Sequence, residues 1–307
     1  LIDNNIIANG GDDGVRFQRF DEAITRTVNP RTPEALAVTI SNNTISGNSR
    51  FPEVDLDIDD DGALEAYSAG IEIHTLNDGT IDDFEVSIED NGIFAHNLET
   101  GLTLPAGSQI NGVNFRVEAD AQIIADVLRN EIRFNEDDGL HTSDRANSGT
   151  DLRDISLSIF SNTISDNFDD GLDFTSVVGQ TQVLVIGRDG TDAQGVSLSN
   201  DISRNGNIGI RFGPGAGAAR AAIFSNTINQ NGQVTSTPIG GAAPGSVVNG
   251  SGIQIQTSAN VAIKGNTFES NNGAGVDINS GGNYSVRDNT FQFNQNDGIE
   301  FVGSTQA

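Results

Sequence analysis

The sequence lacks cysteine, methionine and tryptophan, and its single lysine is Lys264. Without cysteine, neither disulfide bonds nor thiol chemistry contributes to the structure. No apolar run is long enough to span a bilayer, so we predict no membrane insertion. Because the chain starts at Leu1 inside a repeated motif and contains no methionine, we expect it to be a segment of a longer protein.

Positive charge is also scarce. Lys and Arg total 16 against 43 Asp and Glu, which gives a net charge of −27 over 307 residues. This charge repels nucleic-acid phosphates, so we predict no nucleic-acid partner. It is typical of an extracellular or cell-surface setting, where salt screens self-repulsion and divalent cations neutralise carboxylates. Solubility alone is the alternative explanation of the acidity.

One motif recurs along the whole chain, and residues 161–174 (S-N-T-I-S-D-N-F-D-D-G-L-D-F) contain it most fully. An Asn is followed by an apolar residue at plus two, a second Asn at plus five, and then a Gly with two apolar residues one apart. The first Asn recurs at Asn4, Asn43, Asn91, Asn130, Asn162, Asn200, Asn226, Asn266 and Asn289. The second position holds Asn9, Asn48, His96, Asn135, Asn167, Asn205, Asn231, Asn271 and Asn294.

Each copy therefore carries short apolar segments that alternate with period two, which indicates strands. Asn and Gly tolerate left-handed backbone, so they are expected at the bends. Segments this short cannot form a hairpin meander, but they can form one coil of a solenoid in which each strand lies on its equivalent in the next coil. The longer spacings between copies then contain loop insertions.

This pattern resembles the right-handed parallel β-helix family, whose repeat is shared by pectate lyases, polygalacturonases, alginate epimerases, phage tailspikes and bacterial surface proteins. The resemblance covers Leu1 to Phe301 and implies an all-β, right-handed parallel β-helix of about nine coils in a single domain, residues 1–307. In such a fold Asn side chains stack into ladders, and we interpret His96 as a ladder substitute. We expect a core of Ile6, Ile45, Ile93, Ile132, Ile164, Ile202, Leu140, Leu172, Ile210, Phe174, Phe212, Phe268, Phe291 and Phe301.

The insertion at residues 57–62 reads D-I-D-D-D-G and resembles the start of an EF-hand calcium loop. Alternating oxygen ligands before a sharp turn at Gly can wrap a Ca²⁺ ion. Ser68 stands where that loop has its bidentate glutamate. We predict Ca²⁺ ligands at Asp57, Asp59, Asp61 and Glu65, although an acidic chain also produces this motif by chance.

A second candidate site is a column of Asp residues just before the coil Gly, at Asp13, Asp138, Asp170 and Asp297, preceded by Asp12, Asp137 and Asp169. If coils stack, these carboxylates come within strand spacing of one another. They must then bind a cation, share protons at raised pKa, or point apart into solvent. We predict Asp137 and Asp169 as calcium ligands, with the solvated arrangement as the alternative.

A third candidate is the outward position between the two apolar residues after each Gly, which runs Arg16, Glu72, Thr103, His141, Asp173, Arg211, Gln254, Asp277 and Glu300. A His, an Arg and several carboxylates in one groove can perform acid–base chemistry on a glycan. One hypothesis therefore places a catalytic site at Asp138, His141, Asp170, Asp173 and Arg211. A solvated face of mixed charge is the alternative.

Two functions remain open, because this fold hosts both enzymes and inert stalks. The first is a non-catalytic extracellular rod with a structural or adhesive role, stabilised by calcium, whose uncapped ends contact neighbouring chains or domains. The second is a polysaccharide-active enzyme, in which a hydrolase fits the paired carboxylates better than a lyase or an epimerase. The expected partner is a glycan, or neighbouring protein chains or domains at the open ends.

Overall fold

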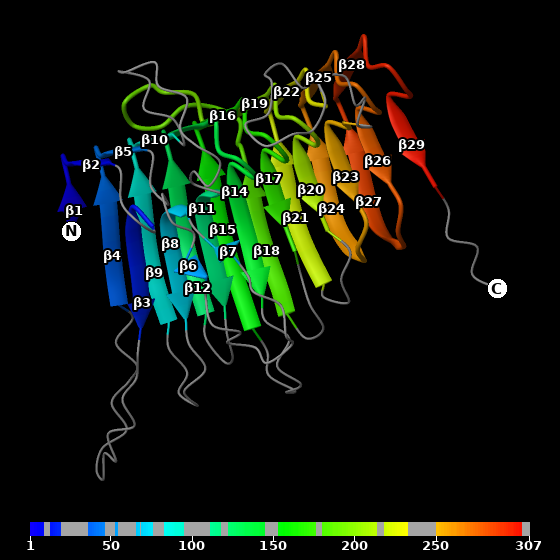
Figure 1. The fold of residues 1–307 in the computed structure, drawn as a ribbon. Helices are drawn as coiled ribbons and strands as arrows, with labels where there is room; N and C mark the ends of the chain where they lie inside the picture. Colours follow the sequence, from blue (N-terminus) through cyan, green and yellow to red (C-terminus); the bar gives the residue numbers. More distant parts are fainter. Residues whose placement is uncertain are drawn as a thin grey trace.

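The computed structural model describes residues 1–8, 13–19, 36–46, 53–54, 66–67, 69–75, 83–94, 111–117, 122–144, 153–175, 180–213, 218–232 and 250–302. These ranges contain strands and turns but no helix, and so no helix that could cross a membrane. Three parallel sheets of nine strands are wound around one axis, with the termini at opposite ends (Figure 1). The predicted parallel β-helix of nine coils is confirmed.

Each coil contributes one strand to each sheet, in the same order along the axis. The first sheet contains β1 (Ile2–Asp3), β4 (Leu36–Ser41), β9 (Asp83–Glu89), β12 (Gln122–Leu128), β15 (Arg153–Phe160), β18 (Gln180–Ile186), β21 (Ala218–Phe224), β24 (Ala259–Lys264) and β27 (Gly282–Arg287). The second contains β2 (Ile6–Ala8), β5 (Thr44–Ser46), β10 (Gly92–Phe94), β13 (Glu131–Arg133), β16 (Thr163–Ser165), β19 (Asp201–Ser203), β22 (Thr227–Asn229), β25 (Thr267–Glu269) and β28 (Thr290–Gln292).

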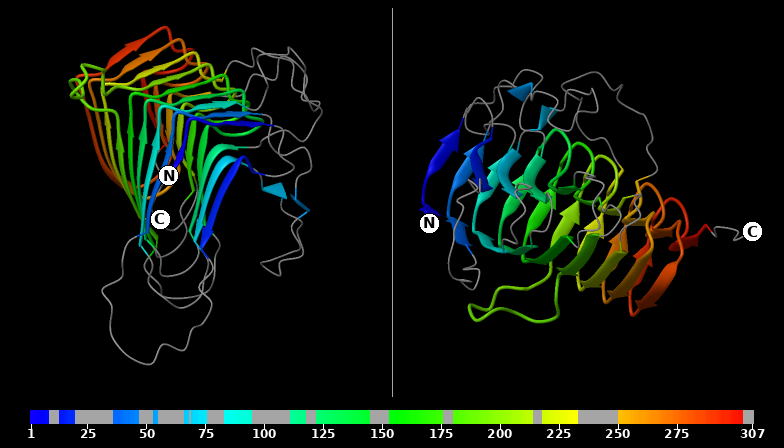
Figure 2. Two further views of the ribbon diagram at one scale, coloured as in Figure 1. Left: turned by 90° about the vertical axis from the view of Figure 1, so that its left-hand side faces the viewer. Right: turned by 90° about the horizontal axis from the view of Figure 1, so that it is seen from below.

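The third sheet carries the candidate site. It contains β3 (Val15–Arg19), β8 (Ala69–Thr75), β11 (Asn111–Val117), β14 (Leu140–Asp144), β17 (Leu172–Phe174), β20 (Ile210–Phe212), β23 (Ile253–Ile255), β26 (Val276–Ile278) and β29 (Ile299–Phe301). A separate antiparallel hairpin of β6 (Glu53–Val54) and β7 (Ala66–Tyr67) lies outside the three sheets (Figure 2).

An asparagine ladder joins the coils at the bend between the first and second sheets. The Oδ1 atom of Asn200 accepts hydrogen bonds from the backbone N of Asn162 at 2.9 Å and from its Nδ2 at 3.0 Å. The Nδ2 of Asn200 in turn donates to the carbonyl oxygen of Ile159 at 2.8 Å and to Asn226 Oδ1 at 2.9 Å. The same contacts link Asn5, Asn43, Asn91, Asn130, Asn162, Asn200, Asn226, Asn266 and Asn289.

A second ladder follows the bend between the second and third sheets, through Asn135, Asn167, Asn205, Asn231, Asn271 and Asn294. The expected rungs Asn9, Asn48 and His96 lie outside the described residues. The first ladder begins at Asn5, so the assignment of Asn4 was wrong by one residue. Asn4 instead adopts a φ of 56°, which turns the chain into the ladder position.

The left-handed residues of these bends are the ones just before the ladder Asn, and not the Asn itself. Ser161 and Asp166, for example, have φ values of 60° and 59° before Asn162 and Asn167. The Gly before the apolar pair of each third-sheet strand was predicted to supply left-handed backbone at a bend. It is required for a different reason, because the next coil leaves no room for a Cβ atom at that position. A Cβ on Gly171 would lie 2.6 Å from the carbonyl oxygen of Gly209 in the next coil, closer than real Cβ atoms approach.

The core consists of stacked apolar side chains, and eleven of the fourteen predicted core residues are buried, among them Ile45, Ile164 and Phe212. Two predictions were wrong: Ile6 is 82% exposed and Phe301 64% exposed. Ile7 pairs with Ile45 in place of Ile6, because the ladder starts one residue later. Phe301 belongs to β29, the last strand of its sheet, and Phe291 is half-buried near the same end.

We predict that the ladder is a main source of stability, and Asn200→Ala tests this. The substitution leaves the buried backbone N–H of Asn162 without its acceptor, whereas the carbonyl of Ile159 keeps the hydrogen bond from Gly187 N. We expect urea unfolding to show a loss of about 1–3 kcal/mol for the group left unpaired. The matched change Asn260→Ala, at an exposed position bonded to Asn283, is expected to alter stability by less than about 0.5 kcal/mol. Equal effects of the two changes would contradict the prediction.

Candidate functional site on the third sheet

The outward positions of the third sheet form one polar row along the axis. In-register pairing aligns Arg16, Glu72, Asn114, His141, Asp173, Arg211, Gln254, Asp277 and Glu300. The predicted member Thr103 was wrong, because coil three closes on β11, whose outward residue is Asn114. Thr103 itself lies outside the described residues. We call the nine aligned residues the outer polar row.

Charges of opposite sign tend to be neighbours in this row. Arg16 Nε lies 3.1 Å from Glu72 Oε2, and Asp173 stands between His141 and Arg211. Because parallel stacking puts equivalent residues side by side, a row of like charges would be destabilising. The alternation removes that repulsion over most of the row.

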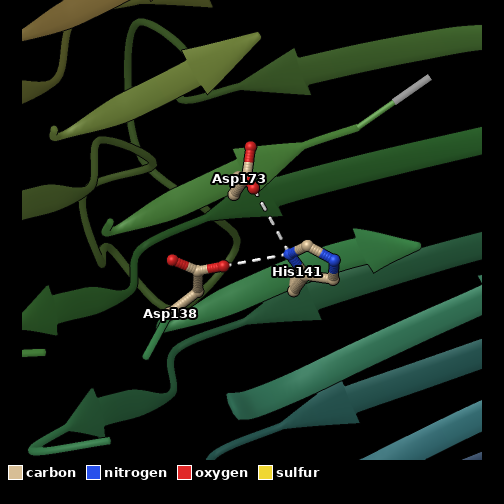
Figure 3. Close-up of side chains that lie close together, drawn as sticks. All are labelled: Asp138, His141 and Asp173. Atoms are coloured by element: carbon tan, nitrogen blue, oxygen red, sulfur yellow. Dashed lines mark hydrogen bonds and ion pairs between the residues drawn. The ribbon is translucent and has the colours of Figure 1, made fainter. Parts of the chain in front are cut away.

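His141 on β14 is held between two carboxylates, as Figure 3 shows. Its Nδ1 lies 2.9 Å from Asp138 Oδ2 and 3.5 Å from Asp173 Oδ2 on the next coil. Burial lowers the pKa of His141, but the hydrogen bonds and charges of Asp138 and Asp173 outweigh burial and raise the pKa to about 10. The imidazole is therefore an imidazolium at neutral pH.

Arg211 on β20 continues the cluster into the next coil. Its Nη1 lies 3.4 Å from Asp170 Oδ2 and 3.8 Å from Asp173 Oδ2. All five residues of the predicted catalytic site thus come together: Asp138, His141, Asp170, Asp173 and Arg211. Their side chains come from three consecutive coils, which only the in-register stacking brings into contact.

Asp138 and Asp170 also serve as rungs of a third ladder, which was not predicted from the sequence. Asp138 Oδ1 accepts from the backbone N of Asp170 at 2.9 Å, and Asp170 Oδ1 accepts from the N of Ile208 at 2.8 Å. Likewise, Asn111 Oδ1 accepts from Asp138 N, and Asp13 Oδ1 accepts from Ala69 N. The recurring Asp before the coil Gly was the sequence signal for this structural role.

Burial raises the pKa of the carboxylates in this cluster. It is the main cause that raises the pKa of Asp138 to about 7 and that of Asp170 to about 9, and neighbouring carboxylates add to both shifts. Burial followed by the charge of Asp169 raises the pKa of Asp137 to about 6. The pKa of Asp169 is also raised, again chiefly by burial. The cluster therefore carries less negative charge than its composition indicates.

Asp137, Asp138 and Asp169 form a group that fits a divalent cation. One carboxylate oxygen from each lies within 4.8 Å of the others. Two oxygens bound to the same Ca²⁺ at 2.3–2.6 Å stand at most about 5 Å apart, so the spacing is compatible with shared coordination. Asn207, at the same position one coil later, hydrogen-bonds Asp169 and was not predicted. The other predicted ligands Asp57, Asp59, Asp61 and Glu65 lie outside the described residues.

The raised pKa of Asp170 predicts that the fold becomes less stable as pH rises. In the unfolded chain Asp170 ionises near pH 3.8, but in the folded chain it keeps its proton to about pH 9. Its favourable contribution is complete below about pH 4 and is lost toward about pH 9. Relative to wild type, Asp170→Asn should gain at least about 1.4 kcal/mol over this range, the equivalent of one pKa unit. Exposed Asp126→Asn is the control in pH-dependent urea unfolding, and parallel curves for all three proteins would contradict the assignment.

Comparison of the sequence with curated proteins and with solved structures finds no match. A family model described as a right-handed beta helix region matches residues 111–307, well over half of the chain. The matched region begins at β11 and runs through the last coil, and the same three sheets continue on its N-terminal side. The chain belongs to the right-handed β-helix family.

Proposed function

We propose that this chain is a non-catalytic rod of an extracellular or cell-surface protein, with a structural or adhesive role and with calcium bound across its coils. The acidic pair of Asp137 and Asp169 carries the proposal. The two side chains are half-buried, occupy equivalent positions on coils four and five, and share the oxygen group with Asp138. A divalent cation there would link two coils that otherwise place carboxylates against each other.

The calcium affinity expected of such a site supports an extracellular or cell-surface location. A site with few carboxylates and several water ligands binds Ca²⁺ weakly, in the range of about 10⁻⁴–10⁻³ M that extracellular modules use. The net charge of −27 also suits a salt-rich environment that screens self-repulsion. Within the described residues, Asp138 and Asp170 already act as ladder rungs, which supports a structural interpretation of the column.

The second candidate is a polysaccharide hydrolase, and the convergence of its five predicted residues favours it. In this candidate Asp138, whose pKa is raised to about 7, is the general acid, since catalysis is most effective when the pKa lies near the working pH. Asp173 supplies the second carboxylate, and one oxygen of each lies within 4.8 Å. This spacing suits a retaining mechanism better than an inverting one. We rank it second because Asp138 is only 3% exposed.

Calcium is expected to stabilise the folded chain. A ligand that binds only the folded state adds about 2.7 kcal/mol at a free concentration 100 times its Kd. Thermal unfolding in millimolar CaCl₂ should therefore have a higher midpoint than in EDTA, and Asp169→Asn should reduce the gain. Asp126→Asn controls for loss of an exposed charge, and Asp59→Asn tests the loop at residues 57–62. If CaCl₂ leaves the midpoint of the wild type unchanged, the calcium proposal is wrong.

The two candidates are separated by an activity screen on neutral and acidic glycans. The rod predicts no turnover by the folded wild-type chain. Turnover that disappears in Asp170→Asn and in Asp138→Asn, with both variants folded by circular dichroism, would refute the rod and establish the hydrolase. Retention at the anomeric carbon, followed by NMR, would further support the assigned roles of Asp138 and Asp173.

A further inference from the structure

We infer that Asp138, His141 and Asp173 form a zinc site beside the outer polar row. One ligand atom from each of the three lies within 4.8 Å of the others. His141 and Asp173 are register partners on β14 and β17, and Asp138 comes just before β14, so coil stacking holds the three side chains together. The group is distinct from the proposed calcium group, which contains Asp137 and Asp169, although Asp138 belongs to both.

The imidazole separates this group from the calcium group. Ca²⁺ takes oxygen ligands, whereas Zn²⁺ binds both imidazole nitrogen and carboxylate oxygen. In Figure 3 the Nδ1 atom of His141 faces both carboxylates, and the other ring nitrogen points away from them. One nitrogen and two carboxylates therefore favour zinc over calcium at this position.

The distances from His141 Nδ1 to the two carboxylates are compatible with coordination of one ion. Two ligands of a tetrahedral zinc, each about 2.0–2.2 Å from the ion, stand roughly 3.3–3.6 Å apart. His141 Nδ1 and Asp173 Oδ2 are 3.5 Å apart, which is longer than the about 2.7–2.9 Å of a charge-assisted hydrogen bond. Asp138 Oδ2 lies 2.9 Å from Nδ1, so this pair must open by about half an ångström when zinc replaces the proton.

The carboxylate of Asp173 independently indicates a missing partner. Its side chain is 8% exposed, and its Oδ1 atom has no hydrogen-bond partner among the described residues. Besides the contact with His141, its Oδ2 atom lies 3.8 Å from Arg211 Nη1, which is also a long contact. Buried carboxylates are normally hydrogen-bonded, paired or bound to a metal. Coordination through Oδ2, the oxygen nearer His141, would supply what this side chain lacks.

The surroundings of the group favour a cation. The His141 side chain is 20% exposed, so the group lies next to solvent. The carboxylates that raise the pKa of His141 attract a metal ion for the same electrostatic reason. Three protein ligands leave the fourth position of zinc to water, which is typical of open sites and not of closed structural ones.

The test is zinc binding to the full chain in calcium-free buffer, measured by calorimetry and by nitrogen NMR of the histidine side chains. Only neutral imidazole is a ligand, so the titration is run at about pH 8, where the proton is displaced more easily than at lower pH. We expect one zinc ion to bind per chain at micromolar free zinc and to change the Nδ1 signal of His141. Absence of binding, or binding that leaves the His141 signals unchanged, would overturn the inference.

His141→Gln and Asp173→Asn each remove one ligand and keep a polar side chain. Each should weaken zinc binding at least about tenfold, since loss of even a hydrogen-bond partner of a ligand costs about 10- to 100-fold. His96→Gln and Asp126→Asn are the matched controls and should leave the zinc affinity unchanged. Asp169→Asn separates the two ion proposals, because it should reduce stabilisation by calcium and affect zinc affinity less than His141→Gln does. Full zinc affinity in a folded His141→Gln variant would also overturn the inference.

Discussion

The structure depends on one constraint: each coil must lie in register on the next, so that every residue stacks on its own equivalent. Asparagine meets this constraint at the bends because its amide is both donor and acceptor. The Oδ1 atom of Asn200 accepts from Asn162 while its Nδ2 donates to Asn226, and the pattern can repeat without end. An ionised aspartate at the same rung has no donor, and a serine has a single donor where Asn200 Nδ2 donates to two acceptors.

The same constraint creates the candidate site. Stacking places equivalent residues of successive coils next to one another. A repeat with Asp before each Gly therefore brings carboxylates together unless some coils carry another residue at that position. Coils six to eight replace that Asp with Ile208, Ser251 and Ala274, so the acidic column is confined to coils four and five among their neighbours. His141 and Arg211 then neutralise the cluster from the outer polar row. The chemistry of the face is thus local, although the fold is repetitive.

The sequence predicted the coil count, the ladders and most of the core, because these follow from a period that repeats nine times. It also predicted the five residues of the cluster that contains His141, since each lies at a fixed offset from a ladder Asn. The prediction was wrong where the repeat alone did not decide between two alignments of the sequence. Asn4 and Asn5 are each followed by Ile at plus two, and only the left-handed φ of Asn4 decides between them. Coil three was misaligned because a long insertion separates its ladder Asn from β11.

The hydrogen-bond partners of the acidic residues also could not be predicted from the sequence. The sequence indicated a column of aspartates but not that Asp138 and Asp170 accept from backbone N–H groups of the next coil. It also gave no indication of Asn207, whose role depends on contact with Asp169. Such contacts depend on side-chain geometry within a coil, which periodicity does not specify.

The most direct test of the account is a double-mutant cycle between His141 and Asp173, which are partners only if coils four and five stack in register. The free energy of unfolding is measured for wild type, His141→Ala, Asp173→Ala and the double variant. The account predicts a coupling energy of about 0.5–3 kcal/mol, as found for residues in direct contact. Additive effects within error would contradict it, because residues so far apart in the chain would then have no interaction to lose.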